Sequence, residues 1–238
     1  MALKSIYIPD PALKDEQLVV DGEEHQHLRV GRVETGEQVE VFNGRGQVWH
    51  GRIVSCERRE TVLRIHETRT VAPVTPHIIL GLSLVKSGAF ELALEKAVEV
   101  GVSRIVPLIA NRSNLAAGRR PDGRRERWTR ILIEAAKQSK RYHLPALDSP
   151  CTFTDAIDLD APSKIVFAER GGGPLESALA ADPVLCLVGP EGGWTDEELE
   201  AAGIAGFKPV GLGGGILRTE TAAIVGVALI HYEFHRNR

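Results

Sequence analysis

Two stretches of the sequence decide the fold: VLCLVGPEGGWTDEEL, residues 184–199, and KPVGLGGGILRTETA, residues 208–222. Each begins with a short apolar run, passes through a glycine-rich loop and enters a segment with helical character. In a parallel sheet, ligands bind beyond the carboxyl ends of the strands, which is where both loops fall. Because glycine lets the backbone approach a ligand closely, the two loops are predicted to present main-chain groups to a flat ligand.

The same alternation of strand and helix extends back to residue 77. Apolar runs typical of strands buried on both faces occupy residues 77–85, 103–110, 164–169 and 184–189, and a last strand is expected at 208–213. Helices are expected from Phe90 to a stop at Gly101, and at 121–142, 195–203 and 219–235. The pattern predicts an α/β fold with a parallel sheet covered by helices on both faces.

Residues 1–72 follow a different pattern, in which apolar and polar residues alternate and glycines interrupt the run at residues 43–46. Several short strands with turns between them predict a small barrel or sandwich. The proline-rich VAPVTP, residues 71–76, is a plausible boundary. We therefore expect a β domain at 1–72 and an α/β domain at 73–238.

The composition narrows the class of protein. The first residues lack the apolar run of a signal peptide, and the longest apolar stretch, residues 221–229, falls well short of the roughly 18 residues that span a bilayer. Three scattered cysteines without CxxC spacing favour neither disulfides nor zinc. His25 and His27 are more typical of a solvated helix or loop than of a metal site. We expect a cytoplasmic protein with no metal and no membrane segment.

Positive charge is concentrated in one segment. Residues 112–141 hold ten basic and three acidic residues, a charge of +7, so the rest of a chain of net charge −3 carries −10. This is either a local site for a polyanion or a solvated helix face. On the expected helix, steps of three and four put four cations and one acid on a single face: Arg127, Arg130, Glu134, Lys137 and Arg141. The four cations, together with Arg112 at the end of the preceding strand, are the candidate phosphate contacts.

GPEGGWTDEEL and LGGGILRTETA together resemble the signature of the ribosomal RNA small subunit methyltransferase E family, the uridine-N3 methyltransferases of 16S ribosomal RNA within the SPOUT superfamily. The similarity continues through residues 111–113 (NRS) and 134–145 (EAAKQSKRYHLP), and HLRV with GEQVEVFNGRG resembles the family's PUA-like β domain. It covers nearly the whole chain. Neither glycine loop matches a Walker A motif or the GxGxxG dinucleotide motif.

The resemblance implies a trefoil knot in the C-terminal domain, an RNA-binding PUA-like β-barrel, and a homodimer whose second subunit completes the site. It implies S-adenosyl-L-methionine as methyl donor and 16S ribosomal RNA, within the small ribosomal subunit, as partner. The donor-binding positions are then Ala168, Glu169, Gly189, Gly192, Gly193, Leu212, Gly213, Ile216, Leu217 and Thr221. The resemblance also places Gln138 and Arg141 at the edge of the active site. The chain departs from the family at Gly214-Gly215, where Pro-Arg is usual, and at Gly31, where Leu is expected.

Methylation at uracil N3 requires loss of a weakly acidic proton, which a base or a cation near the developing charge assists. We assign Arg218 to a substrate oxygen or phosphate, and Glu220 or Glu191 to the proton. Structural alternatives remain: Glu220 at a helix start complements the dipole, Thr219 caps that helix, or Arg218 pairs with either acid. Trp194 either stacks on a base or packs in a core or subunit contact. Two rival classes are a non-catalytic RNA-binding protein and a Rossmann-type nucleotide enzyme.

Overall fold

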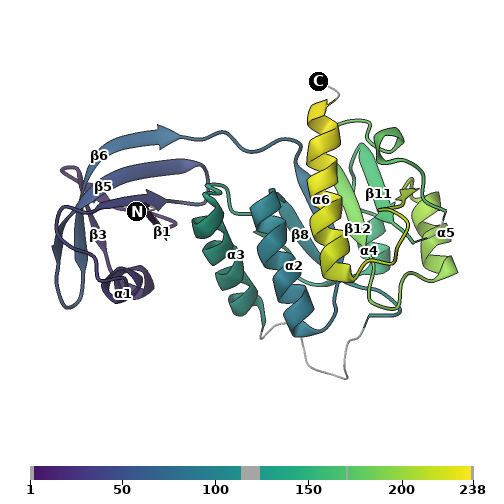
Figure 1. Ribbon diagram of the computed structural model, residues 1–238, viewed down its shortest axis with the longest axis horizontal. Coiled ribbons are helices and arrows are strands. Elements are labelled where there is room, and N and C mark those ends of the chain that lie inside the picture. The colour runs from purple at the N-terminus through teal and green to yellow at the C-terminus, as the bar shows by residue number, and fades with distance from the viewer. Residues whose placement is uncertain (1–2, 114–123, 170, 237–238) are drawn as a thin grey trace. The chain divides into compact units, whose positions relative to one another are not determined.

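The computed structural model describes residues 3–113, 124–169 and 171–236 (Figure 1). The chain divides into two compact units. The first contains the N-terminal region to Pro73 together with Ala136–Leu144, and the second contains Val74–Ala135 and the chain from Pro145 onward. Residues 136–144, which the sequence assigned to the second domain, therefore belong to the first unit.

The second unit is built on a parallel sheet with the strand order β10-β8-β7-β12-β11-β13, and β9 pairs with β8 at its side. The strands are β7 (Ile78–Ser83), β8 (Arg104–Ile109), β9 (Ala146–Leu147), β10 (Cys151–Thr152), β11 (Ser163–Phe167), β12 (Val184–Val188) and β13 (Lys208–Val210). The five principal predicted strands are all present, and each is shorter than its apolar run. The α/β fold with a parallel sheet is therefore confirmed.

Helices cover this sheet and connect its strands. They are α2 (Ser87–Val100), α3 (Arg125–Ser139), α4 (Phe153–Ile157), α5 (Asp196–Ile204) and α6 (Thr219–Arg236), with a 3₁₀ turn η2 (Leu175–Ser177). As predicted, α2 ends at Gly101, which adopts a left-handed φ of 100°, and Thr195 caps α5 in a reciprocal arrangement with Glu198. α2 and α6 lie side by side (Figure 1), and Gly226 of α6 allows the Phe167 ring to approach the helix.

Helix α3 differs from the predicted helix at 121–142. Residues 114–123 lie outside the described residues. They include the first three residues of the predicted helix and Arg119, Arg120 and Asp122 of the basic segment. At its C-terminal end the helix stops at Ser139, because Lys140 adopts a left-handed φ of 57°. The apolar positions at helical spacing form the inner face of α3: Trp128, Leu132, Ala135 and Ala136 are buried, and Ile131 is partly buried.

The first unit contains a sheet with the strand order β1-β4-β5-β6-β3-β2. Its strands are β1 (Lys4–Tyr7), β2 (Leu13–Lys14), β3 (Gln17–Val20), β4 (Gln38–Phe42), β5 (Gln47–Cys56) and β6 (Thr61–Thr70). Helix α1 (Gly22–Val30) was not predicted, because little of it is apolar and it buries only His25 and Leu28. His25 is not solvated: its Nδ1 lies 2.9 Å from the hydroxyl of Thr61.

Residues 136–144 are joined to this sheet by backbone and side-chain contacts. The Gly46 amide donates to the Tyr142 carbonyl at 2.9 Å, and the Leu144 amide donates to the Gly44 carbonyl at 3.0 Å. Glu40, only 3% exposed, accepts hydrogen bonds from Lys140 at 3.0 Å and from the Tyr142 hydroxyl at 2.8 Å. Burial and then this contact with Glu40 raise the pKa of Tyr142 to about 12, so its phenol stays protonated and donates.

No cluster of three or more histidine, cysteine or acidic side chains in residues 3–113, 124–169 and 171–236 has the arrangement of a metal site. Over the same ranges, no helix is both long enough and apolar enough to cross a membrane.

Candidate active site

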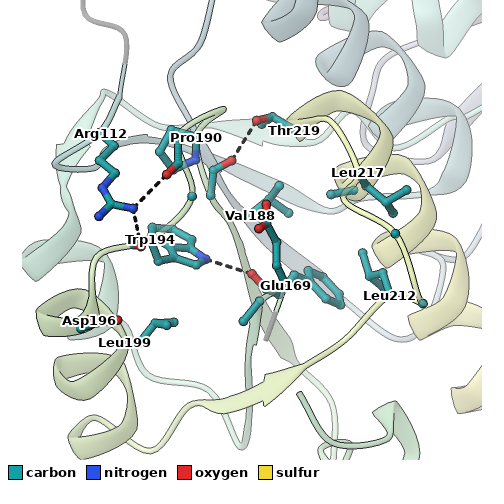
Figure 2. A pocket seen from close by; sticks show the side chains of 18 residues that line it. Arg112, Glu169, Val188, Pro190, Trp194, Asp196, Leu199, Leu212, Leu217 and Thr219 are labelled. Atoms are coloured by element: carbon teal, nitrogen blue, oxygen red, sulfur yellow. Dashed lines mark hydrogen bonds between the residues drawn. The ribbon is translucent and has the colours of Figure 1, made fainter. Parts of the chain in front are cut away.

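A cavity of about 420 Å³ lies where the carboxyl ends of β11 and β12 meet the two glycine loops (Figure 2). Most of the predicted donor-binding residues line it: Ala168, Glu169, Gly189, Gly192, Gly193, Leu212, Gly213 and Leu217. Ile216 and Thr221 do not, and the Ile216 side chain is 79% exposed. The end of β11 and the two glycine loops, which are separated in the sequence, thus line one cavity.

The first loop, residues 189–193, is shaped around Trp194. The Trp194 indole nitrogen donates to the Phe167 carbonyl at 2.9 Å, which ties the end of β12 to the end of β11. A Cβ on Gly189 would lie 3.0 Å from the indole ring, so the ring would have to shift by a few tenths of an ångström to admit a side chain there. Trp194 is buried and packs near Phe153. The structure therefore favours the packing role of Trp194 over stacking on a base.

The second loop follows β13 and leads into α6. Gly213 has a φ of 123°, a conformation that side chains disfavour. The buried Thr219 hydroxyl donates to the Gly189 carbonyl at 2.9 Å, so the first residue of α6 fastens the second loop to the first. Gly215, one of the two glycines that replace the usual Pro-Arg, also lines the cavity.

Arg112 was expected to contact phosphate, but it also forms part of the cavity wall. Its Nη1 donates to the carbonyls of Gly192 at 3.0 Å and Trp194 at 3.2 Å. A Cβ on Gly192 would lie 3.1 Å from the Arg112 Cβ, so a side chain there would press against Arg112. Arg112 therefore supports the first loop from the end of β8.

The cavity has a charged side and an apolar side. Figure 2 shows Arg112, Trp194 and Asp196 on one side and Leu212 and Leu217 on the other, with Glu169 between them. Its charged lining, among the described residues, consists of one cation and two carboxylates: Arg112, Asp196 and Glu169. Such a surface suits a ligand with a flat apolar part and a zwitterionic part.

The three residues assigned to catalysis lie next to the cavity in sequence but do not line it. Glu191 and Arg218 are exposed, and Glu220 is partly buried at the start of α6. Within the described part of the chain, none of the three forms a side-chain hydrogen bond or ion pair. The ion pair between Arg218 and either acid, left open by the sequence, is therefore not formed.

The predicted RNA contacts on α3 are placed differently from one another. Arg127 is exposed but forms an ion pair with Glu91 at 2.5 Å, and Arg130 and Gln138 are exposed. Arg141 is partly buried, which lowers the pKa of its guanidinium. Lys137 is only 6% exposed and pairs with Glu24 at 3.1 Å. Because its ammonium is engaged inside the first unit, Lys137 is not retained as a phosphate contact.

Sequence reasoning missed part of the cavity wall. The additional residues lie at strand ends, in the first glycine loop or in the first turn of a helix: Phe167, Val188, Pro190, Asp196, Leu199, Thr219 and Ala222. The strand ends had a usable signal, since the carboxyl ends of parallel strands meet at one edge of the sheet. Leu199 and Ala222 had none, because apolar helix positions are equally typical of a core.

Comparison with known proteins identifies the family. A model of the RNA methyltransferase domain matches residues 73–231, and a model of the RNA methyltransferase PUA domain matches residues 20–65. The ribosomal RNA small subunit methyltransferase E of Synechocystis is 32% identical over 97% of this chain and 78% of its own length.

Two solved structures have the same fold over nearly their whole length. The ribosomal RNA small subunit methyltransferase E of Neisseria gonorrhoeae, bound to S-adenosyl methionine, has a TM-score of 0.89 at 28% identity, covering 97% of this chain and 98% of that one. A methyltransferase from Legionella pneumophila, in complex with the same cofactor, also has a TM-score of 0.89 at 28% identity, with 98% of each chain covered. The chain belongs to the ribosomal RNA small subunit methyltransferase E family.

Proposed function

We propose that the protein transfers a methyl group from S-adenosyl-L-methionine to N3 of a uridine in 16S ribosomal RNA. The observation that carries the proposal is the cavity that the two glycine loops share at the carboxyl edge of the sheet. Its volume lies within the usual range for a small-ligand site. The family membership supports the reaction class, and the Neisseria relative binds this donor.

The cavity residues fit the donor's chemistry. The leucine side, Leu212 and Leu217, suits an adenine ring, and the backbone of the glycine loops supplies donors and acceptors for its edge. Arg112 complements a carboxylate, while Glu169 and Asp196 complement ammonium and ribose hydroxyl groups. When bound, the donor supplies an electrophilic methyl group on a sulfonium.

The chain's own part in the reaction is to position the uracil and to manage its N3 proton. An in-line approach of N3 to the methyl group provides much of the rate through positioning alone. In the proposed mechanism Arg218 stabilises the negative charge that develops on a uracil oxygen, and Glu191 or Glu220 accepts the proton. These side chains are not engaged with other described residues, which leaves them available for substrate.

The remaining parts of the proposal concern RNA and assembly. We propose that Arg127, Arg130, Gln138 and Arg141 contact RNA, that the β unit is a PUA-like RNA-binding barrel, and that the α/β domain contains a trefoil knot. We also propose a homodimer that completes the site, acting in the cytoplasm on the small ribosomal subunit. Sequence resemblance supports these points, and the bond from Thr219 to Gly189 supports a close association of the two loops.

The proposal is tested by methylation of 16S ribosomal RNA with labelled donor, offered both as free RNA and as assembled subunits lacking the modification. Mass mapping of nucleosides should find N3-methyluridine at one position. Gly213→Val should abolish methylation and donor binding, since that backbone conformation disfavours a side chain. A wild-type protein that binds RNA but shows no donor binding by calorimetry would support the non-catalytic alternative instead.

A further inference from the structure

One row of side chains crosses the exposed face of the sheet in the first unit. Direct cross-strand partners link Gln38 on β4 to Arg52 on β5, Arg52 to Arg64 on β6, Arg64 to Gln17 on β3, and Gln17 to Lys14 on β2. All five side chains are exposed. Each of them donates hydrogen bonds, and none is an acid. We name these five residues the arginine row.

The centre of the row is unfavourable for folding. Arg52 and Arg64 are direct partners on neighbouring antiparallel strands, and like charges in that relation destabilise a sheet. Arg52 has one long hydrogen bond, from Nη1 to the Gly36 carbonyl at 3.4 Å. Arg64 forms no side-chain hydrogen bond or ion pair with any described residue. Folding alone therefore gives no reason for this pair of cations.

Several other arginines of the chain are arranged differently, because each faces a carboxylate. The pairs are Arg45 with Asp10, Arg104 with Asp148, Arg127 with Glu91, and Arg236 with Glu176. Arg52 and Arg64 have no carboxylate partner among the described residues, and they differ from other such arginines, for example Arg58 and Arg59, in being direct cross-strand partners. An external anion is the chemistry that satisfies them.

The shape of the row indicates what kind of anion. Strands lie about 4.8 Å apart, so four steps from β4 to β2 extend over roughly 19 Å. A small anion would occupy only one step, whereas a sugar–phosphate backbone presents acceptors along this whole length. Val19, two residues along β3 from Gln17, is 51% exposed and offers an apolar contact for a ribose or base.

We propose that the arginine row binds the sugar–phosphate backbone of the RNA substrate. The proposal rests on the proposed function for the identity of the polyanion, and it assigns the contact to residues of the β unit outside the basic segment at residues 112–141. Phosphate contacts of this kind position the RNA and carry no sequence information. Their signature is a strong dependence of affinity on salt.

The test compares two double variants that remove the same charge. Filter binding of transcribed 16S ribosomal RNA over a series of KCl concentrations gives the log–log slope of affinity against salt. Arg52→Gln with Arg64→Gln should reduce the slope by about 1.5 and weaken binding roughly 30-fold at 0.1 M salt. Arg58→Gln with Arg59→Gln, in the exposed turn between β5 and β6, should leave both nearly unchanged. Equal losses in the two double variants would show an effect of net charge and would overturn the proposal.

A second variant separates binding from folding. Arg64→Glu creates an attractive pair with Arg52, so its thermal midpoint should rise while its RNA affinity falls. A misfolded protein would lose both, so a lower midpoint with lower affinity contradicts the proposal, as does an RNA affinity equal to wild type. Affinity for S-adenosylmethionine should not change in either variant. If the wild type binds RNA through the row but does not methylate it, the proposed function fails and the row stands.

Discussion

Arg112 holds the first glycine loop through two carbonyls, so the shape of that loop depends on one guanidinium. Arg112→Gln is expected to weaken S-adenosylmethionine binding by up to about 30-fold, because two hydrogen bonds of about 1 kcal/mol each are lost. Titration calorimetry measures this directly. Arg127→Gln, which removes an exposed ion pair on α3, is the control and should bind the donor normally. An unchanged affinity in Arg112→Gln would show that the loop keeps its shape without this residue.

Glu40 gives the first unit a dependence on pH. Burial alone would raise the pKa of its carboxyl, but hydrogen bonds from Lys140, Tyr142 and His50 outweigh burial and hold the pKa below 4.5. Since the pKa of Glu40 is lowered in the folded state, the ionised carboxylate stabilises the fold. This contribution to the free energy of unfolding is fully present above the unfolded pKa of about 4.3 and is lost as the pH falls through the folded value.

Glu40→Gln is therefore expected to lower the free energy of unfolding at pH 7 by about 1–3 kcal/mol, since the amide cannot satisfy all of these donors. It should also flatten the loss of stability below pH 5. Urea unfolding at several pH values measures both effects. Glu37→Gln, which removes a half-exposed ion pair with Lys4, is the matched control. If both variants lost stability below pH 5 as steeply as wild type does, Glu40 would not be the source of that loss.

At the scale of elements, two chain segments touch backbone to backbone beside β13. The Gly173 amide donates to the Pro209 carbonyl at 2.9 Å, and a Cβ on Gly172 would lie 2.1 Å from the Gly211 nitrogen. Gly172→Ala is expected to destabilise the second unit by about 3 kcal/mol or more, because neither backbone has room to yield. Gly173→Ala is the control, since its nearest atoms are 4.0 Å away. Thermal unfolding that ranks the two variants equally would contradict this account.

The elements of the second unit were largely predictable, because its strands are buried on both faces and its helices have distinct ends. Gly101 and Thr195 marked a helix end and a helix start by their own chemistry. Helix α1 was not predictable, since its burial depends on His25 meeting Thr61, a contact between segments 36 residues apart in the sequence. The end of α3 was missed for a similar reason: Lys140 leaves the helix to meet Glu40.

At the scale of the whole molecule, α6 carries an apolar stripe that its own unit leaves partly or fully exposed. The stripe consists of Ala222, Val225, Ala228, Leu229 and Tyr232, of which Tyr232 is 61% exposed. We expect sedimentation equilibrium to give about twice the chain mass of 25.9 kDa. Leu229→Asp should shift the protein toward monomers, because a charge would be buried in the contact. Ile204→Asp, at a more exposed apolar position at the end of α5, should leave the mass unchanged. A monomeric wild type would refute the dimer.

The site was predictable to the extent that it is made of backbone. The glycine loops were recognisable in the sequence, and eight of the ten expected donor-binding residues line the cavity. Arg112 shows the limit of this reasoning. Because it belongs to a basic segment, the sequence predicts a phosphate contact, and only the structure shows that it donates to the carbonyls of Gly192 and Trp194. Lys137 shows the same limit, since helical spacing could not indicate that Glu24, 113 residues earlier, would bury it.

The discontinuous make-up of the first unit has a consequence for synthesis of the protein on the ribosome. Its sheet is complete once Pro73 has emerged, but the segment that satisfies Glu40 and covers the loop at residues 43–46 ends at Leu144. The nascent chain must therefore grow by another 71 residues (144 − 73) before the unit closes. At about 5–20 residues per second, that interval lasts roughly 4–14 seconds, during which the Glu40 carboxylate and the loop at residues 43–46 lack these partners.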